Sequence, residues 1–162
     1  MSKKTIYLAI SAGLLLGLSG YACYRLLKPI ATPTPIPMSS TPQLQVRDLI
    51  LTVDLADDDR SRYQGLSNRA AMDEMHGMYF IFDAPVQSGF IMRDMLFALD
   101  ILWIKNNRIV QIDKNLLPPN ATGGVPIVVY PVEPITHVLE VNGGWSDRHS
   151  IQVGDPVVLK VE

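Results

Sequence analysis

Several sequence features that would identify an activity are missing from this chain. Cys23 is the only cysteine, so neither an intrachain disulfide nor a cysteine-based metal site can form. No glycine-rich phosphate loop is present, because Gly143 and Gly144 lack the required spacing and a following lysine. No serine lies in a nucleophile-elbow sequence, and the histidines lack the close spacing of a paired zinc motif. The sequence therefore predicts no catalytic motif, no metal and no cofactor.

The chain also lacks a basic cluster after its N-terminal region. Lys3, Lys4, Arg25 and Lys28 lie within the first 28 residues, which leaves 10 basic against 16 acidic side chains in the remainder. Phosphate backbones are bound by clustered Lys and Arg side chains, so an acidic domain argues against nucleic acid as a partner.

Residues 5–24 form an uncharged, apolar stretch with basic residues on both sides. At about 1.5 Å per residue, a helix of this length spans about 30 Å, the thickness of a bilayer core. We predict that residues 1–28 are an uncleaved, single-pass signal-anchor with the following domain outside the cytoplasm. Two other interpretations stay open: a cleaved signal peptide, suggested by the small residues Gly20 and Ala22, and a lipoprotein signal ending at Cys23.

Residues 29–42 separate this segment from the rest of the chain. They contain five prolines and five Ser or Thr residues, a composition that buries little apolar surface and favours an extended polyproline conformation. At about 3.1 Å per residue, such a linker holds the following domain up to about 40 Å from the membrane. Residues 43–162 are predicted to form one globular domain, which is large enough to fold without disulfides.

Short apolar segments and frequent turns predict that this domain is mainly β. Residues 48–56 alternate between apolar and polar side chains, as in an antiparallel strand with one face in water. Asn106-Asn107 suits a two-residue hairpin, because asparagine tolerates positive φ. The other predicted strands are residues 78–82, 89–92, 99–104, 108–113, 127–130, 135–141 and 156–161, with a long irregular loop at 114–126.

One or two short helices are predicted beside the strands. The aspartates at 57–59 supply an N-cap and first-turn carboxylates for a helix that ends near Gln64, with Gly65 as its C′ residue. A cap explains these aspartates better than a calcium site, since no further spaced oxygen ligands accompany them. The second helix is predicted near residues 146–149. Together the elements predict a compact antiparallel barrel or sandwich, preceded by a transmembrane helix.

Three ordered blocks of sequence resemble a known family. They are Arg60, Gly65-Leu66, Arg69 and GMYFIF at 77–82; Phe90, Met92 and LDIL at 99–102; and HVLEVNGGWSDRHSIQVGD at 137–155. Over residues 44–159 the chain resembles the domain-of-unknown-function family 192, an uncharacterised prokaryotic family. The resemblance implies a small, mainly β, jelly-roll-like domain, often exported or membrane-anchored, with no established activity.

The chain departs from this family's pattern within the second of these blocks, between Met92 and Leu99. After the basic residue the family usually has Asn-Thr, and it has a proline before Leu-Asp, whereas this chain has Asp94-Met95 and Ala98. If the polar Asn-Thr pair belongs to a site in the family, the resemblance implies that this site is altered here.

Asp100 stands in the most apolar run of the chain, FIMRDMLFALDILWIKNNRIVQI at residues 90–112. A buried, ionised carboxylate is unstable unless a cation or several N–H donors compensate it. We expect an arginine partner, and the candidates are Arg60, Arg62, Arg69 and Arg93. Two interpretations stay open: a structural ion pair that fixes strand register, or the floor of a polar cleft with an arginine and Trp145 at its rim.

Other side chains near these motifs have both a structural and a functional interpretation. Trp145 is either a packed corner or, if exposed, a stacking platform for a sugar or peptide. The methionines at 72, 75, 78, 92 and 95 fill a core by default, and an adaptable binding surface is the second interpretation. The candidate ligand-binding residues are Arg60, Arg69, Met92, Arg93, Asp94, Asp100, Asn142 and Trp145.

The anchor, the linker and the acidic β domain together suggest a membrane-tethered, extracytoplasmic module that binds a small ligand or an envelope polymer. An alternative is a hydrolase or lyase-like enzyme with Asp94 and Asp100 as an acid–base pair. That mechanism requires the two carboxyl groups within about 10 Å of each other across an open cleft. A third alternative is a non-catalytic scaffold for an envelope protein, and the sequence makes no prediction of the oligomeric state.

Overall fold

The computed structural model describes residues 41–160, and the fold is given for this part of the chain. The predicted membrane anchor and most of the proline-rich linker lie outside the described residues, so both stay predictions. Among the helices that are described, none has the length and apolar character needed to cross a membrane.

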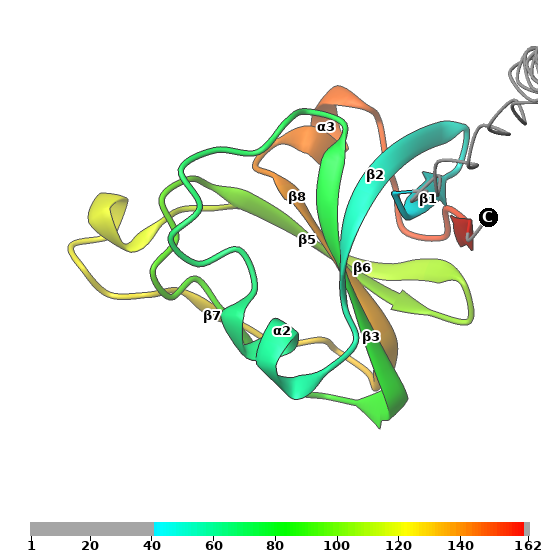
Figure 1. Ribbon diagram of the computed structural model, residues 1–162, viewed down its shortest axis with the longest axis horizontal. Helices are drawn as coiled ribbons and strands as arrows, with labels where there is room; N and C mark the ends of the chain where they lie inside the picture. The colour runs from blue at the N-terminus through cyan, green and yellow to red at the C-terminus, as the bar shows by residue number, and fades with distance from the viewer. Residues whose placement is uncertain (1–40, 161–162) are drawn as a thin grey trace, which may run out of the picture. The chain divides into compact units, whose positions relative to one another are not determined.

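Between residues 41 and 160 the chain forms nine strands and two short α-helices. Seven strands make one sheet in the order β6-β5-β8-β3-β2-β1-β9 (Figure 1). These strands are β1 (Gln43–Val46), β2 (Leu49–Ala56), β3 (His76–Val86), β5 (Leu99–Lys105), β6 (Arg108–Leu116), β8 (Ile135–Asn142) and β9 (Val157–Lys160). The other elements are the paired β4 (Phe90–Ile91) and β7 (Val128–Val129), the helices α2 (Asp59–Gln64) and α3 (Trp145–Arg148), and the 3-10 turn η1 (Pro119–Ala121).

The local predictions are largely confirmed. Asn106 and Asn107 have positive φ values of 51° and 58°, as their hairpin between β5 and β6 requires. Asp58 caps α2 by accepting a hydrogen bond from the backbone N–H of Ser61 at 2.7 Å, and Gly65 ends the helix with a φ of 51°. β1 has no counterpart among the predicted strands.

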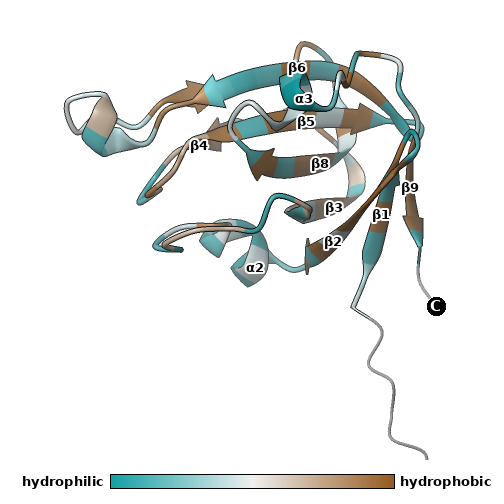
Figure 2. Ribbon diagram, turned by 90° about the horizontal axis from the view of Figure 1, so that it is seen from above, coloured by the Kyte–Doolittle hydropathy of each residue, from teal (hydrophilic) through white to brown (hydrophobic). Residues whose placement is uncertain are grey.

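The topology differs from the predicted antiparallel barrel or sandwich in two respects. β2 and β3 run parallel, from Thr52 opposite His76 to Ala56 opposite Phe80, and α2 lies in the crossover that joins them. The sheet also curls into a half-barrel, whose two edges meet at one end through a bridge between Arg108 and Pro156. In Figure 2, β1, β2 and β9 accordingly run across the direction of β5, β6 and β8. The alternation in residues 48–56 shows which side chains face water but not the direction of the neighbouring strand.

The large sheet carries an apolar core on each face. The barrel core takes side chains from all seven strands: Leu44, Leu51, Tyr79, Leu102, Ile109, Leu139 and Val157, together with Trp145 from α3. The pocket-side core lies on the opposite face and includes Leu66, Met78, Phe80, Met92, Met95, Ile101, Trp103 and Val138. Because successive residues of a strand face opposite sides, β5 is buried on both faces from Leu99 to Ile104.

Asp100 is fully buried within β5, and its carboxylate accepts three backbone hydrogen bonds. The donors are the N–H groups of Asn115 at 2.7 Å, Gly144 at 2.8 Å and Ser146 at 2.8 Å. Charge-assisted hydrogen bonds of this kind compensate a buried carboxylate without a direct ion pair. Since Asn115 belongs to β6 and the other two donors to the start of α3, one side chain joins three elements.

Two glycines let the chain approach Asp100 closely enough to donate these bonds. Gly144 has a φ of 76°, a conformation that favours glycine. A Cβ atom on Gly143 would lie 2.7 Å from Cβ of Ala98 and 2.9 Å from Oδ1 of Asn115, closer than such atoms approach. The backbone N–H of Gly143 donates to the carbonyl oxygen of Ala98 at 2.8 Å, so the turn lies directly against the start of β5.

Replacing Asp100 with alanine is expected to lower the free energy of unfolding by about 3–5 kcal/mol, because three N–H donors lose their acceptor inside the protein. Urea denaturation followed by circular dichroism measures this loss. Asp57→Ala, which removes an exposed carboxylate, serves as the control and should change the free energy by less than about 0.5 kcal/mol. A loss below about 1 kcal/mol for Asp100→Ala would contradict the structural role of these bonds.

Candidate functional site

The arginines that were predicted to pair with Asp100 are directed elsewhere. Arg69 pairs with Asp54 and Arg62 pairs with Asp59, each at 2.7 Å. Arg93 donates to the carbonyl oxygen of Tyr63 at 2.8 Å, and Arg60 is exposed to solvent. The predicted arginine partner of Asp100 is therefore wrong. Backbone N–H groups compensate this carboxylate. A sequence does not show which N–H groups will do so, because every residue except proline carries one.

Trp145 and Asn142 hold the fold together and do not line a cleft. Trp145 is fully buried in the barrel core, which confirms the packed-corner interpretation. Asn142 donates hydrogen bonds to the carbonyl oxygens of Met72 and Asp73 at 3.0 and 3.1 Å, which fixes the loop before β3. A cleft with Asp100 as its floor and Trp145 at its rim is therefore wrong, since both side chains are fully buried.

Asp94 and Asp100, the predicted acid–base pair, lie in different surroundings. Asp94 is exposed beside Arg93, with 3.7 Å between Oδ2 and Nε, whereas Asp100 is buried. Neither carboxylate lines the pocket described below, so the geometry does not support a mechanism across a shared cleft. Met92 is buried in the pocket-side core. Within residues 41–160, no group of three His, Cys, Asp or Glu side chains is placed to hold a metal ion.

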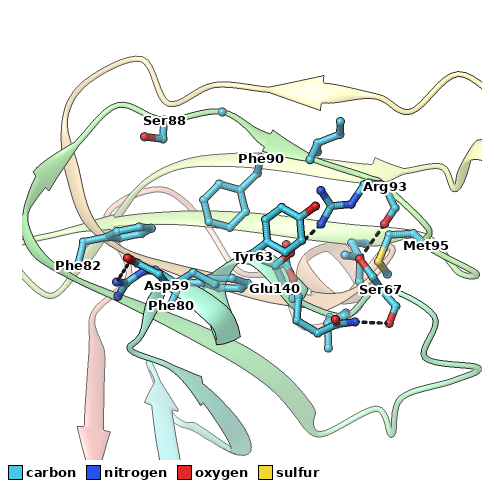
Figure 3. Close-up of a pocket in the computed structure, with 17 residues that line it drawn as sticks. Asp59, Tyr63, Ser67, Phe80, Phe82, Ser88, Phe90, Arg93, Met95 and Glu140 are labelled. Atoms are coloured by element: carbon cyan, nitrogen blue, oxygen red, sulfur yellow. Dashed lines mark hydrogen bonds and ion pairs between the residues drawn. The ribbon is translucent and has the colours of Figure 1, made fainter.

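A pocket of about 310 Å³ lies between α2 and the pocket-side face of the sheet (Figure 3). One wall is α2 with the residues that follow it as far as Ser67, and another is the segment 88–95. The sheet contributes Leu99 and, among others, Glu140. Of the residues predicted from the sequence as ligand-binding, only Arg93 belongs to this lining.

Three phenylalanines give the pocket an aromatic interior. The rings of Phe80 and Phe90 meet edge to face, with 4.9 Å between their centroids and 75° between their planes. Phe82 and Phe90 make a second edge-to-face pair at 6.5 Å, and Trp103 supports Phe90 from the core at 5.3 Å. Each ring is thus held by another ring, so the aromatic wall is formed before any ligand binds.

Two arginines and a tyrosine make the mouth of the pocket polar. Tyr63 is 73% exposed, and the guanidinium carbon of Arg93 lies 4.1 Å from the centroid of its ring. Arg62 lies 5.6 Å from the centroid of Phe82 and forms its ion pair with Asp59. The pocket therefore combines an apolar interior with a charged entrance, as small-molecule sites commonly do.

Among the described residues that line the pocket, Glu140 carries the only buried carboxyl group. It lies in β8 opposite Met78 of β3 and Ile101 of β5, and it is 8% exposed. Its Oε2 atom has no hydrogen-bond partner in the protein. Burial raises the pKa of Glu140 to about 8, because an apolar environment disfavours the charged form. At neutral pH the side chain is therefore mostly a neutral carboxylic acid that can donate a hydrogen bond.

The sequence contains a signal for Glu140 that is equivalent to the one for Asp100. Residues 137–142, HVLEVN, place a carboxylate inside a predicted buried strand. Both acids therefore raise the same question of how a buried charge is compensated. The answer differs because Asp100 meets three N–H donors and Oε2 of Glu140 meets none, and only the structure shows this difference.

The model of domain-of-unknown-function family 192, described as "Uncharacterized ACR", matches residues 42–159. The chain belongs to this family. The resemblance found in the three sequence blocks is thereby confirmed. Among curated proteins, none matches the chain.

Two solved structures share the fold of family 192 seen here. A protein of unknown function from Novosphingobium aromaticivorans DSM 12444 matches with a TM-score of 0.66 and 26% identity, over 80% of this chain and 94% of that chain. A protein from Sinorhizobium meliloti 1021, proposed to be a transcription regulator, matches with a TM-score of 0.65 and 30% identity, over 73% of this chain and 91% of that chain. The family and these structures support the mainly β fold and assign no activity to this chain.

Replacing Glu140 with glutamine is expected to remove a destabilisation that increases with pH. The pKa of Glu140 is about 8 in the folded protein, and its ordinary value is 4.5. Between pH 4.5 and pH 8 the folded state therefore binds more protons than the unfolded state does. The wild-type protein should therefore lose stability as pH rises through this range. From pH 5 to pH 9, the free energy of unfolding of Glu140→Gln relative to wild type should increase by about 4 kcal/mol.

Urea denaturation at several pH values measures this difference, and its change with pH is the test. A constant offset between the two proteins would report only the unmet hydrogen bonds of the buried amide. Glu133→Gln is the control, because Glu133 is a partly exposed carboxylate paired with Lys105 and should affect stability by less than about 1 kcal/mol. Parallel pH profiles for wild type and Glu140→Gln would contradict the raised pKa.

Proposed function

We propose that the domain binds a small molecule in the pocket between α2 and the sheet, with Glu140 as the polar group at its inner part. The observation that carries this proposal is the buried Oε2 atom of Glu140, which has no partner in the protein. An unsatisfied buried polar atom costs roughly 1–3 kcal/mol, and native proteins contain few of them. A ligand that reaches this atom would supply the missing interaction.

The lining supports a ligand with an apolar or planar body. Phe80, Phe82 and Phe90 present aromatic surface inside the mouth, and Figure 3 shows the three rings on one side of Glu140. A volume of about 310 Å³ is at the lower end of the usual range for small-molecule sites. This size favours a small molecule over an envelope polymer, although one terminal unit of a polymer would also fit.

The proposed location is the outer side of a membrane. It rests on the sequence alone, through the apolar residues 5–24 and the proline-rich residues 29–42. In this arrangement the linker lets the pocket reach ligands at some distance from the bilayer. A nucleic-acid partner is not proposed, in spite of the description of the Sinorhizobium protein, because the chain after residue 28 has an excess of acidic side chains.

Fragment screening by protein NMR tests the pocket. We expect binding fragments to shift the backbone resonances of residues 62–67, 88–95 and 140, because these segments line it. Ser88→Trp places a bulky side chain at an exposed position of the lining and should weaken fragment binding at least about tenfold. Ala84→Trp adds the same side chain at an exposed position outside the lining and should leave binding unchanged.

Two results would contradict the proposed function. One is a set of fragment-induced shifts that does not include the pocket segments. The other is fragment binding that Ser88→Trp leaves intact while the variant keeps the wild-type fold.

A further inference from the structure

We infer that the ligand of this pocket is an organic cation, an amine or a methylated ammonium group, whose positive charge pairs with the carboxylate of Glu140 between aromatic rings. This inference rests on the proposed function and specifies the chemical class of its ligand. It follows from the charges that face the pocket and from its aromatic surfaces, and it predicts the release of one proton on binding.

The charged groups at the mouth already have partners within the protein. The titratable side chains that line the pocket with Glu140 are Asp59, Arg62 and Tyr63 from α2 and Arg93 from the segment after β4, while β3 and β5 contribute none. Arg62 pairs with Asp59 and donates to the carbonyl oxygen of Ile81 at 2.8 Å. Arg93 donates to the carbonyl oxygen of Tyr63 at 2.8 Å.

Glu140 differs from these groups because no cation of the described chain forms an ion pair with it and no N–H group donates to Oε2. Both arginines are held at the mouth on Tyr63 and Phe82, whereas Glu140 lies deeper on the sheet. When Glu140 is ionised, its carboxylate therefore has no positively charged partner in the described chain. A ligand that carries a positive charge to the inner part of the pocket would supply that partner.

The aromatic lining suits the same ligand class. The negative face of an aromatic ring attracts a cation within about 6 Å of its centroid. Arg93 on Tyr63 and Arg62 on Phe82 show that two rings of this lining already bind cationic groups in this way. Phe80 and Phe90 extend the aromatic surface inward toward β5 and β8, so a ligand ammonium beside Glu140 would meet rings as well as the carboxylate.

Binding of such a cation is coupled to proton release. Before a ligand binds, Glu140 is mainly a neutral acid below its pKa of about 8. When R–NH3+ enters, the O–H bond of Glu140 breaks, one proton leaves to solvent, and the carboxylate and ammonium remain as an ion pair. A neutral or anionic ligand would instead leave the acid protonated, so the sign of the pH dependence distinguishes the two ligand classes.

The experiment uses the full chain in detergent micelles with three matched probes: benzylammonium, benzyl alcohol and benzoate. NMR titration should show that benzylammonium binds best of the three at pH 8. Its affinity should rise between pH 6 and pH 8 by at least about tenfold, and by about 50-fold if only the ionised form of a group with a pKa of about 8 binds. Calorimetry in buffers of different ionisation enthalpy should show release of about one proton per benzylammonium bound at pH 6.5.

Glu140→Gln separates the charge of the carboxylate from its shape. At pH 8 this variant should bind benzylammonium at least about tenfold more weakly than wild type and should lose the pH dependence. Its affinity for benzyl alcohol should stay within about threefold of wild type, because the aromatic lining is unchanged. Glu133→Gln, a substitution of the same kind outside the lining, should leave all three affinities unchanged.

The outcomes distinguish failure of this inference from failure of the proposed function. Benzyl alcohol or benzoate that binds in the pocket as well as benzylammonium, without proton release, would overturn the cation assignment and leave the pocket as a small-molecule site. Fragment hits that include no amine would do the same. If neither the probes nor any fragment shift the pocket resonances, the proposed function and this inference both fail.

Discussion

Burial of β5 and β8 on both faces is the constraint that decides the rest of this structure. The barrel core covers one side of these strands and the pocket-side core covers the other. A carboxylate in either strand must therefore find hydrogen-bond donors inside the protein or give up its charge. Asp100 and Glu140 lie almost opposite each other on these neighbouring strands, on opposite faces, and they meet the constraint in opposite ways.

Asp100 meets the constraint through distant parts of the backbone. Its N–H donors come from the end of β6 and from the start of α3, which follow it by 15 to 46 positions in the sequence. They reach the carboxylate because Gly143 lets the turn lie against Ala98. This arrangement fixes the connection after β8 and thereby places Trp145 in the barrel core. The side chain that was the strongest functional candidate in the sequence is therefore explained by the fold alone.

The features that could be predicted from the sequence are those that depend on neighbouring residues. The turn at Asn106-Asn107, the cap at Asp58 and the family blocks are all local patterns, and the structure contains them. The parallel pairing of β2 with β3 could not be predicted, because alternation of side chains does not report the direction of the next strand. The partner of Asp100 could not be predicted either, since every residue except proline carries the same N–H donor.

The parallel pairing also explains why Glu140 lies in a pocket and not in a filled core. A parallel connection must cross from one end of the sheet to the other, and here a six-residue helix and an irregular loop make that crossing. So short a helix cannot cover β3, β5 and β8 completely, which leaves aromatic surface and one uncompensated acid beneath it. The burial that disfavours the ionised acid also excludes water from any ion pair formed there, so it strengthens attraction to a cation. A ligand bound only by the folded state then stabilises the fold in proportion to its affinity. On this argument, the expected loss of stability with pH and the proposed selectivity for a cation have one physical cause, the burial of β8.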